Sequence, residues 1–235
     1  MGRLEGSFEG IVITRIVKGI DGAAAATGVV VVIDVLRAFT TAAYAFGAGI
    51  DELELVATPE DAFAVSGYRM GEVGGRLIPG FDHNNSPSQL IGKCLAGRAV
   101  LRTGSGTRCV VAATKAQEIW LGSLVVASAT ARALAGCDEV TLVASGPPHE
   151  GEEDIACAEW IAALLQGVHP SRDAVVAAVA GSRAAAKHRS DDADFPVEDI
   201  DCAVAIDAFD FAMKTERQGG RLIARPFFHL ASADP

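Results

Sequence analysis

The chain has 235 residues, of which half are hydrophobic, and it carries thirty acidic against twenty basic side chains for a net charge of −10. This length allows one large α/β domain or two lobes that share a sheet. The negative charge argues against nonspecific binding to nucleic acid or to an anionic membrane surface. An anionic substrate would therefore need a local basic pocket or a metal ion.

The sequence shows no recognisable targeting or membrane segment. Its first ten residues are polar and rich in glycine, and no apolar run is long enough to cross a bilayer. Five cysteines are scattered without a CxxC pair, at spacings that fit no zinc site. We expect Cys109, Cys157 and Cys202 to be small core residues. These features favour a reduced, cytoplasmic compartment.

Two short runs rich in β-branched residues, 11–17 and 29–33, predict the first two strands. The second run has no polar alternation, which is typical of a strand buried on both faces in a parallel sheet. Asp34 would then sit at the carboxyl end of that strand, where ligands bind in open α/β sheets. An N-cap for the following helix is the alternative role for this acid.

The helix after Asp34 carries polar side chains that suit an anion. Arg37, Thr40 and Thr41 fall on one helical face, away from the apolar face. A cation, two hydroxyls and the free N–H groups of a helix start would together suit a phosphate.

Strand and helix then alternate, with a strand over 53–57 and a helix that begins at Thr58. This alternation predicts a parallel sheet covered on both faces. The next segment, 70–87, is long, rich in glycine and dotted with polar side chains. A loop of this length is usually functional or disordered, and its apolar residues argue against disorder. A helix over 86–95 is predicted to follow.

A glycine-rich turn of Gly104, Ser105, Gly106 and Thr107 connects a predicted strand over 98–103 to a predicted helix over 108–116. Its free N–H groups could hold an oxyanion. The turn lacks the Lys of a P-loop and the third Gly of a dinucleotide fingerprint, so a plain connection is the alternative.

Further strands are predicted over 124–127 and 140–144, each followed by a helix, at 128–134 and 152–166. Asp154 projects toward the buried face of the second helix, and Glu153 lies at its margin. An acid on an apolar face is costly unless it is paired or bound to a metal. Acids in a first turn also serve the helix dipole, which is the alternative here.

The last third predicts an alanine-rich helix over 174–188, an acidic connection over 190–196 and a helix over 197–211. We interpret this part as a helical cover without a site. Four acids in it are expected to be solvated surface charges: Asp199, Asp201, Asp207 and Asp210. The predicted fold is a three-layer α/β/α architecture with a largely parallel sheet and a helical C-terminal third. It forms one domain over 1–235, or two lobes of about 1–120 and 121–235.

Four loops are thus predicted at strand ends, around Asp34, 72–86, 104–107 and 145–154. They combine carboxylate and amide oxygens, which suit Mg²⁺, with hydroxyls and N–H groups. Three arginines, Arg37, Arg76 and Arg108, could add positive charge for a phosphate. Metal-assisted phosphoester hydrolysis is the economical hypothesis from these residues.

Five blocks of the sequence, in matching order and spacing, closely resemble the ComB-like 2-phosphosulfolactate phosphatases. The blocks are VVIDVLRAFTT (31–41), GE (71–72), GFDHNNSP (80–87), TGSGTR (103–108) and EDIACA (153–158). The resemblance implies a three-layer α/β/α fold and a Mg²⁺-dependent acid phosphatase that converts 2-phosphosulfolactate to sulfolactate and phosphate, a step toward coenzyme M. Two positions depart from the family pattern, since Val73 replaces an Arg and Ser105 replaces an Asn.

Roles follow for the individual residues. The expected Mg²⁺ ligands, directly or through water, are Asp34, Glu72, Asp82 and Asp154, with Glu153 either supporting a ligand or taking the place of Asp154. Asp34 and Arg37 are the expected catalytic residues. The substrate and its phosphate would be held by Arg37, Thr40, Thr41, Asn85, Ser86, Gly104, Ser105, Gly106 and Thr107. The nucleophile would be a water activated by the metal ion, or Asp34 itself through an aspartyl-phosphate.

Two other functions are compatible with these residues. The same scaffold could act on another small anionic phosphoester because of Val73 and Ser105, or it could be a non-catalytic anion-binding protein. The expected partner is a small phosphoester rather than nucleic acid or membrane, and a homo-oligomer is possible.

Overall fold

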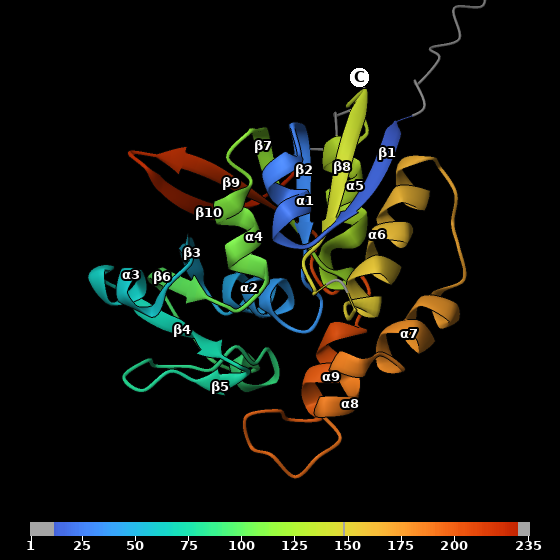
Figure 1. The fold of residues 1–235 in the computed structure, drawn as a ribbon. Coiled ribbons are helices and arrows are strands. Elements are labelled where there is room, and N and C mark those ends of the chain that lie inside the picture. Colours follow the sequence, from blue (N-terminus) through green and yellow to red (C-terminus); the bar gives the residue numbers. More distant parts are fainter. Residues whose placement is uncertain (1–11, 148, 230–235) are drawn as a thin grey trace, which may run out of the picture.

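The computed structural model describes residues 12–147 and 149–229 (Figure 1). Within these residues, ten strands form one sheet in the order β1-β8-β2-β7-β9-β10-β3-β6-β4-β5. The strands are β1 (Ile13–Lys18), β2 (Gly28–Ile33), β3 (Ile50–Val56), β4 (Tyr68–Val73), β5 (Arg76–Leu77), β6 (Gly97–Arg102), β7 (Ala116–Gly122), β8 (Glu139–Ala144), β9 (Ala212–Gln218) and β10 (Arg221–Phe227). Ile11, the first residue of the predicted strand over 11–17, lies outside the described residues.

Helices cover both faces of this sheet, so the predicted three-layer α/β/α architecture is confirmed (Figure 1). The α-helices are α1 (Gly19–Ala25), α2 (Ala38–Gly47), α3 (Pro59–Ala64), α4 (Gly106–Ala112), α5 (Ala127–Leu134), α6 (Glu152–Leu165), α7 (Arg172–Ala180), α8 (Arg183–Lys187) and α9 (Glu198–Ala203). Within the described residues, no helix is long and apolar enough to span a membrane.

Strand β2 lies at the centre of the packing, as its unbroken run of apolar residues predicts. Val30 and Val32 pack into a core with helices α2 and α4. Val31 and Ile33 point the other way, into a second core with α5 and α6. Because successive side chains of a strand alternate between faces, β2 needs apolar residues at every position to join both cores.

The parallel strands form two groups that run in opposite directions. β1, β8, β2 and β7 are mutually parallel, and so are β3, β6 and β4. The hairpin β9–β10 separates the groups and pairs with each of them in an antiparallel manner. The sequence predicted loops at one common edge of the sheet. Instead, the carboxyl ends of two opposed groups meet at the centre of the molecule (Figure 1).

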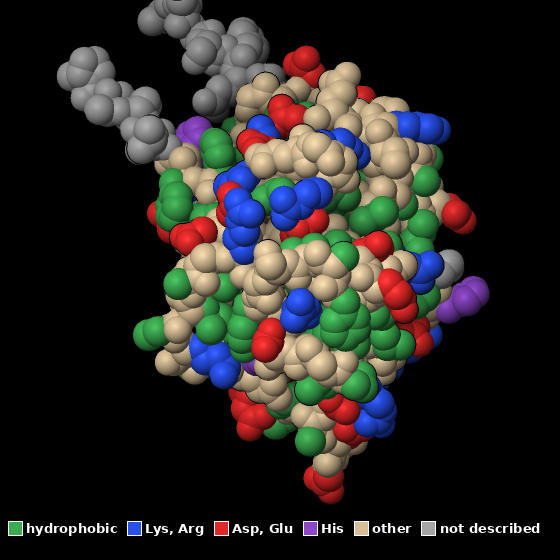
Figure 2. Space-filling model, turned by 90° about the vertical axis from the view of Figure 1, so that its left-hand side faces the viewer, with side chains coloured by type: hydrophobic (Ala, Val, Ile, Leu, Met, Phe, Trp, Pro, Cys, Tyr) green, Lys and Arg blue, Asp and Glu red, His purple; other side chains and the backbone are tan. Residues whose placement is uncertain are grey.

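The predicted helical C-terminal third is confirmed in part, since α7, α8 and α9 are followed by the hairpin β9–β10. The predicted helix over 197–211 ends at Ala203 as α9, and the chain then returns to the middle of the sheet as β9 and β10. Gly219 and Gly220 make its tight turn, both with positive φ (56° and 84°), which glycine adopts at little cost. Basic and acidic side chains lie close together on the face shown in Figure 2. The hairpin pairs with β3 through the ion pairs Arg221–Glu54 and Arg225–Glu52.

Several local predictions differ from the structure for identifiable reasons. The long loop over 70–87 contains strands β4 and β5, and the helix predicted over 86–95 is a single 3₁₀ turn, η1 (Ser88–Leu90). The strand predicted over 124–127 is the 3₁₀ turn η2 (Leu124–Val126), because the preceding segment forms β7 instead. The helix predicted over 174–188 divides at Gly181, where Ser182 caps α8 by accepting from the N–H of Ala185 (3.1 Å).

Candidate active site

A cleft of about 390 Å³ lies where the carboxyl ends of the two strand groups meet. Asp34 follows β2 and Ser145 follows β8 on one side. Glu72 near the end of β4 and Gly104 after β6 come from the other side. Ligand sites outside the carboxyl ends of parallel strands are the rule in α/β folds, and here the ends of two opposed groups supply one cleft.

Asp34 is buried and held by neutral donors on both oxygens. Its Oδ1 accepts from the N–H of Ala38 (2.9 Å), which supports the start of α2. Its Oδ2 accepts from the N–H of Gly106 (2.9 Å) and from Ser145 Oγ (3.0 Å). A Cβ at Gly106 would lie 2.7 Å from Asp34 Oδ2. The glycine therefore allows the turn after β6 to approach the carboxylate.

Asp154 faces Asp34 from the first turn of α6. Its Oδ1 accepts from the N–H of Val35 (2.8 Å), and its Oδ2 accepts from the N–H of Gly146 (3.0 Å) and from Ser145 Oγ (3.2 Å). One serine hydroxyl thus lies between two carboxylates but has a single proton to donate. At any moment, one of the two acids lacks that hydrogen bond.

Two glutamates complete what we call the carboxylate wall, the four acids Asp34, Glu72, Glu153 and Asp154. Glu72 accepts from the N–H groups of Gly75 (2.6 Å) and Gly104. Glu153 is 4% exposed, and its Oε2 has no hydrogen-bond partner among the described residues. No Lys or Arg in the described chain forms an ion pair with any of the four.

The electrostatics of the wall follow from burial without counter-ions. Burial raises the pKa of Asp34, and the charge of Glu72 adds to this effect. Burial, then the charges of Asp34 and Glu153, raise the pKa of Asp154 well above its ordinary value. Burial, with a further contribution from Asp34, raises the pKa of Glu153 to about 7. The wall is a site of excess negative potential that a cation would relieve.

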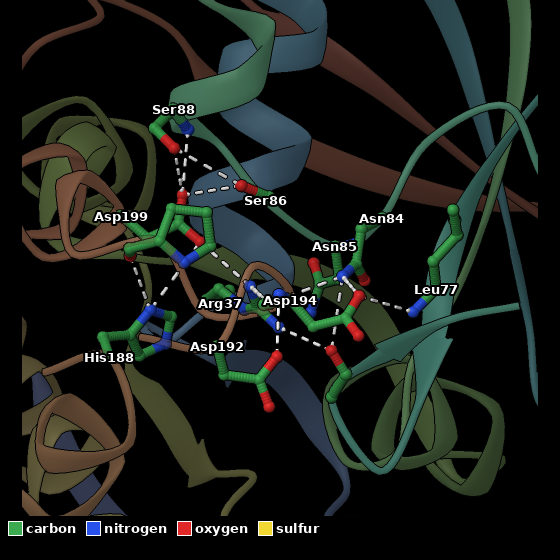
Figure 3. A network of polar contacts seen from close by, with 12 residues as sticks. Arg37, Leu77, Asn84, Asn85, Ser86, Ser88, His188, Asp192, Asp194 and Asp199 are labelled. Carbon is green, nitrogen blue, oxygen red and sulfur yellow. Dashed lines mark hydrogen bonds and ion pairs between the residues drawn. The ribbon is translucent and has the colours of Figure 1, made fainter. Parts of the chain in front are cut away.

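Across the cleft, Arg37 has a fully buried counter-ion (Figure 3). Its Nη1 lies 2.9 Å from Asp199 Oδ2 and also donates to the carbonyl of Asp194 (2.8 Å), while Nη2 donates to the carbonyl of Gly75 (3.1 Å). The ring of Phe195 lies 5.0 Å from the guanidinium, close enough for a cation–π contact. The positive charge of Arg37 is therefore compensated within the fold.

Asp199 is buried, so the prediction that it is a solvated surface charge is wrong. Its Oδ1 accepts from the hydroxyls of Ser86 (2.8 Å) and Ser88 (2.6 Å), and from the N–H of Ser88 (3.1 Å). His188 Nδ1 lies 3.8 Å from Oδ2 and bonds to the Pro196 carbonyl (2.9 Å). Burial, together with nearby Arg37, lowers the pKa of His188.

We call this group the Arg37 cluster, namely Arg37, Ser86, Ser88, His188 and Asp199. Three further acids were predicted to be solvated surface charges. Asp201 and Asp210 are exposed, as predicted, whereas Asp207 is half-buried and accepts from Ser128 Oγ (2.8 Å).

Eight of the predicted site residues line the cleft together. They are Asp34, Arg37, Glu72, Asn85, Gly104, Ser105, Glu153 and Asp154. Asn85 is buried, and its Oδ1 has no partner among the described residues, so this oxygen remains free to accept from a donor or to contact a cation.

Six predicted site residues do not line the cleft. Asp82 is exposed and accepts from the N–H of Arg69 (2.8 Å), and its side chain lies apart from the carboxylate wall. Ser86 belongs to the Arg37 cluster and Gly106 lies beneath Asp34. The remaining three are buried threonines: Thr40 donates to the Val35 carbonyl (2.7 Å), the Thr107 hydroxyl donates to the Thr103 carbonyl (3.1 Å), and the Thr41 hydroxyl has no partner within the described part of the chain.

The two departures from the family pattern lie in different surroundings. Val73 is 52% exposed and does not line the cleft, whereas Ser105 does. Arg76 pairs with Asp192 (2.8 Å) and Asp194 (3.1 Å) outside the cleft, and Arg108 is exposed. Neither arginine supplies the basic charge that the sequence analysis considered.

Sequence reasoning assigned no individual role to several residues that line the cleft, among them Ser145, which lies in a predicted site loop, and Lys187, His188 and Phe195, which do not. Ser145 follows a correctly predicted strand, so the strand-end rule that found Asp34 could have found it. Lys187, His188 and Phe195 come from a segment after α7 that carries no local signal of a site. Only the tertiary fold brings that segment to the cleft.

Comparisons with known proteins indicate the family of this chain. The family model described as 2-phosphosulpholactate phosphatase matches residues 15–194, which include the whole carboxylate wall and end before Asp199. Three relatives, each named probable 2-phosphosulfolactate phosphatase, come from Bacillus subtilis (34% identity over 149 residues), Deinococcus radiodurans (42% over 147) and Thermus thermophilus (36% over 145).

These alignments cover 58–59% of this chain and 61–64% of the relatives, so the similarity spans less than two thirds of their length. The match to the family model is longer and covers well over half of the chain. The chain belongs to the 2-phosphosulpholactate phosphatase family.

Proposed function

We propose that this protein is a Mg²⁺-dependent phosphatase that hydrolyses 2-phosphosulfolactate to sulfolactate and phosphate, the reaction that leads toward coenzyme M. The carboxylate wall is the observation that carries this proposal. Four buried acids without counter-ions among the described residues line one cleft, beside the unpartnered Oδ1 of Asn85 and the glycine turn after β6. The names of the relatives, which cover part of the chain, support the same substrate.

The acids of the wall fit Mg²⁺ better than a metal held entirely by protein side chains. In the described residues, no three His, Cys, Asp or Glu side chains are already gathered around one point. Mg²⁺ is commonly held by one or two carboxylates, with water and phosphate oxygens as the other ligands. Asp34 and Asp154, which share the Ser145 hydroxyl, are the two carboxylates that would hold it, and the unpartnered Oε2 of Glu153 would accept a hydrogen bond from one of its waters. Such an ion would neutralise phosphate charge and polarise the attacking water.

The residues of the chain position the substrate around these acids. The amide nitrogen of Asn85 and the N–H of Ser105 line the cleft and could donate to phosphate oxygens, whereas the N–H of Gly104 already donates to Glu72. Both oxygens of Asp34 already accept backbone hydrogen bonds, which lowers their nucleophilicity and supports water as the nucleophile. The Arg37 cluster fixes the opposite side of the cleft and leaves some guanidinium N–H donors free for an anion.

The test is phosphate release from 2-phosphosulfolactate and related 2-phospho-acids, with and without Mg²⁺, for the wild type, Asp34→Asn and Asp201→Asn. Asp201 is an exposed acid outside the cleft and serves as the matched control. The proposal expects Mg²⁺-dependent release that prefers the sulfonate, is lost in Asp34→Asn and persists in Asp201→Asn. Release from a different phosphoester alone would reject the substrate but keep the chemistry. No release from any phosphoester by the folded protein would favour the anion-binding alternative.

A further inference from the structure

The charges that line the cleft are strongly unbalanced. Five carboxylates line it, but only two Lys or Arg side chains do so among the described residues, Arg37 and Lys187. Arg37 is neutralised by buried Asp199, and three of its five N–H donors are already used. A substrate with a second acidic group would meet repulsion from the wall unless another cation faces it.

Lys187 is the cation that is able to change its partner. It lies at the end of α8, and its Nζ is 3.1 Å from Oε2 of Glu150, which also lines the cleft. The two side chains are 54% and 40% exposed. An ion pair with that much exposure contributes little to folding, so exchanging Glu150 for a ligand's acid costs little.

We propose that Lys187 is the specificity-determining residue of this cleft and binds the acidic group that is not transferred, a carboxylate or sulfonate of the substrate. This inference rests on the proposed function and deepens it. The phosphate belongs beside the carboxylate wall and its cation, so the remaining acid needs a separate positive group. Lys187 supplies this positive group. Its ammonium lies on a flexible stem and acts as a point charge, unlike the planar guanidinium of an arginine.

Glu150 is the internal competitor in this arrangement. In the free protein, the carboxylate of Glu150 accepts a hydrogen bond from the ammonium of Lys187. The acid of the substrate would have to replace this carboxylate. Removing the charge of Glu150 should therefore tighten binding of an acid, whereas removing the charge of Lys187 should weaken it. Opposite effects from two adjacent groups would not arise from a merely structural role.

The experiment is calorimetric titration with sulfolactate and, separately, with inorganic phosphate, in the presence of Mg²⁺. The proteins are the wild type, Lys187→Gln, Glu150→Gln and Arg183→Gln. Arg183 is the matched control, because it lies on the same helix, is 66% exposed, pairs with Glu152 (3.1 Å) and does not line the cleft.

We expect Lys187→Gln to weaken the binding of sulfolactate about tenfold or more, which is the usual effect of losing one charge-assisted hydrogen bond. The affinity for phosphate should change less than about threefold. Glu150→Gln should tighten sulfolactate, and Arg183→Gln should leave both affinities within about twofold of the wild type. Unchanged sulfolactate affinity in Lys187→Gln, equal weakening of both ligands, or a wild type that does not bind sulfolactate would overturn the inference.

This result is separable from that of the proposed function. Turnover of 2-phosphosulfolactate by a wild type whose sulfolactate affinity does not depend on Lys187 would keep the function and reject the role of Lys187. Lys187-dependent binding of sulfolactate without any phosphate release would reject the function and keep the acid-binding role.

Discussion

The carboxylate wall and the Arg37 cluster face each other across one cleft, yet they treat buried charge in opposite ways. In the cluster, Arg37 and Asp199 neutralise each other, and serine donors occupy the remaining lone pairs of Asp199. In the wall, Asp34, Glu153 and Asp154 repel one another and receive only neutral donors. A buried charge with a counter-ion serves the fold, whereas a buried charge without one indicates a ligand.

The substitution Asp34→Asn should give the largest effect, and it should fall on activity rather than on stability. We expect phosphate release to fall about a thousandfold or more, because an acid beside the reacting phosphate is lost. The free energy of unfolding of the metal-free protein should change little, because the loss of one repulsive charge offsets the backbone N–H that faces the NH2 group of the new Asn. Urea unfolding followed by circular dichroism measures it, and a clear loss of stability would break the comparison.

Asp199→Asn should show the reverse pattern. The substitution leaves the buried guanidinium of Arg37 without its counter-ion, and we expect a loss of about 3 kcal/mol or more in the free energy of unfolding. Urea unfolding of this variant and of Asp201→Asn, whose side chain is exposed, makes a matched pair. A loss below about 1 kcal/mol would show that Arg37 does not depend on Asp199.

The pH dependence of stability should report the wall directly in metal-free protein. The pKa of Glu153 is raised from its ordinary 4.5 to about 7, so the folded protein binds more protons there than the unfolded chain between these values. Stability should therefore fall as pH rises from about 4.5 to about 7, by on the order of 3 kcal/mol from this group. Unfolding at a series of pH values, with Glu153→Gln for comparison, measures the slope. An equal slope of stability against pH in both proteins would show that Glu153 does not cause this pH dependence.

Gly106→Ala should give the smallest effect of the four. Its new Cβ would lie 2.7 Å from Asp34 Oδ2 and 2.9 Å from the Cβ of Ala38. We expect a loss of about 1 to 2 kcal/mol in the free energy of unfolding, together with reduced phosphate release, because Asp34 must move. Gly136→Ala is the control, since nothing lies within 4 Å of a Cβ there. Equal effects of the two substitutions on stability and activity would argue against close packing at Asp34.

The carboxylate wall could be predicted from the sequence because its signals are local. Asp34 follows a run of apolar residues that only a doubly buried strand explains, and Asp154 lies on the apolar face of its helix. Each pattern can be recognised from residues that are close in the sequence. Asp82 shows where this reasoning stops: it lies in the same loop as Asn85, but its carboxylate turns outward to the N–H of Arg69.

The Arg37 cluster could not be predicted, because its members meet only through the tertiary fold. Arg37 and Asp199 are 162 positions apart, and an acid in an amphipathic pattern is most simply read as a surface charge. The hairpin β9–β10 was missed for a related reason. Its strands are largely polar toward the tip, so alternation is weak, although Gly219-Gly220 is a typical hairpin turn.

Unfolding temperature with and without Mg²⁺, for the wild type, Asp34→Asn and Asp199→Asn, tests the central claim most directly. A ligand that binds only the folded state raises its stability. If the wall holds a cation, Mg²⁺ should raise the unfolding temperature of the wild type and of the destabilised Asp199→Asn variant, but not that of Asp34→Asn. No shift in the wild type, or an equal shift in Asp34→Asn, would contradict the claim that these uncompensated acids form the metal site.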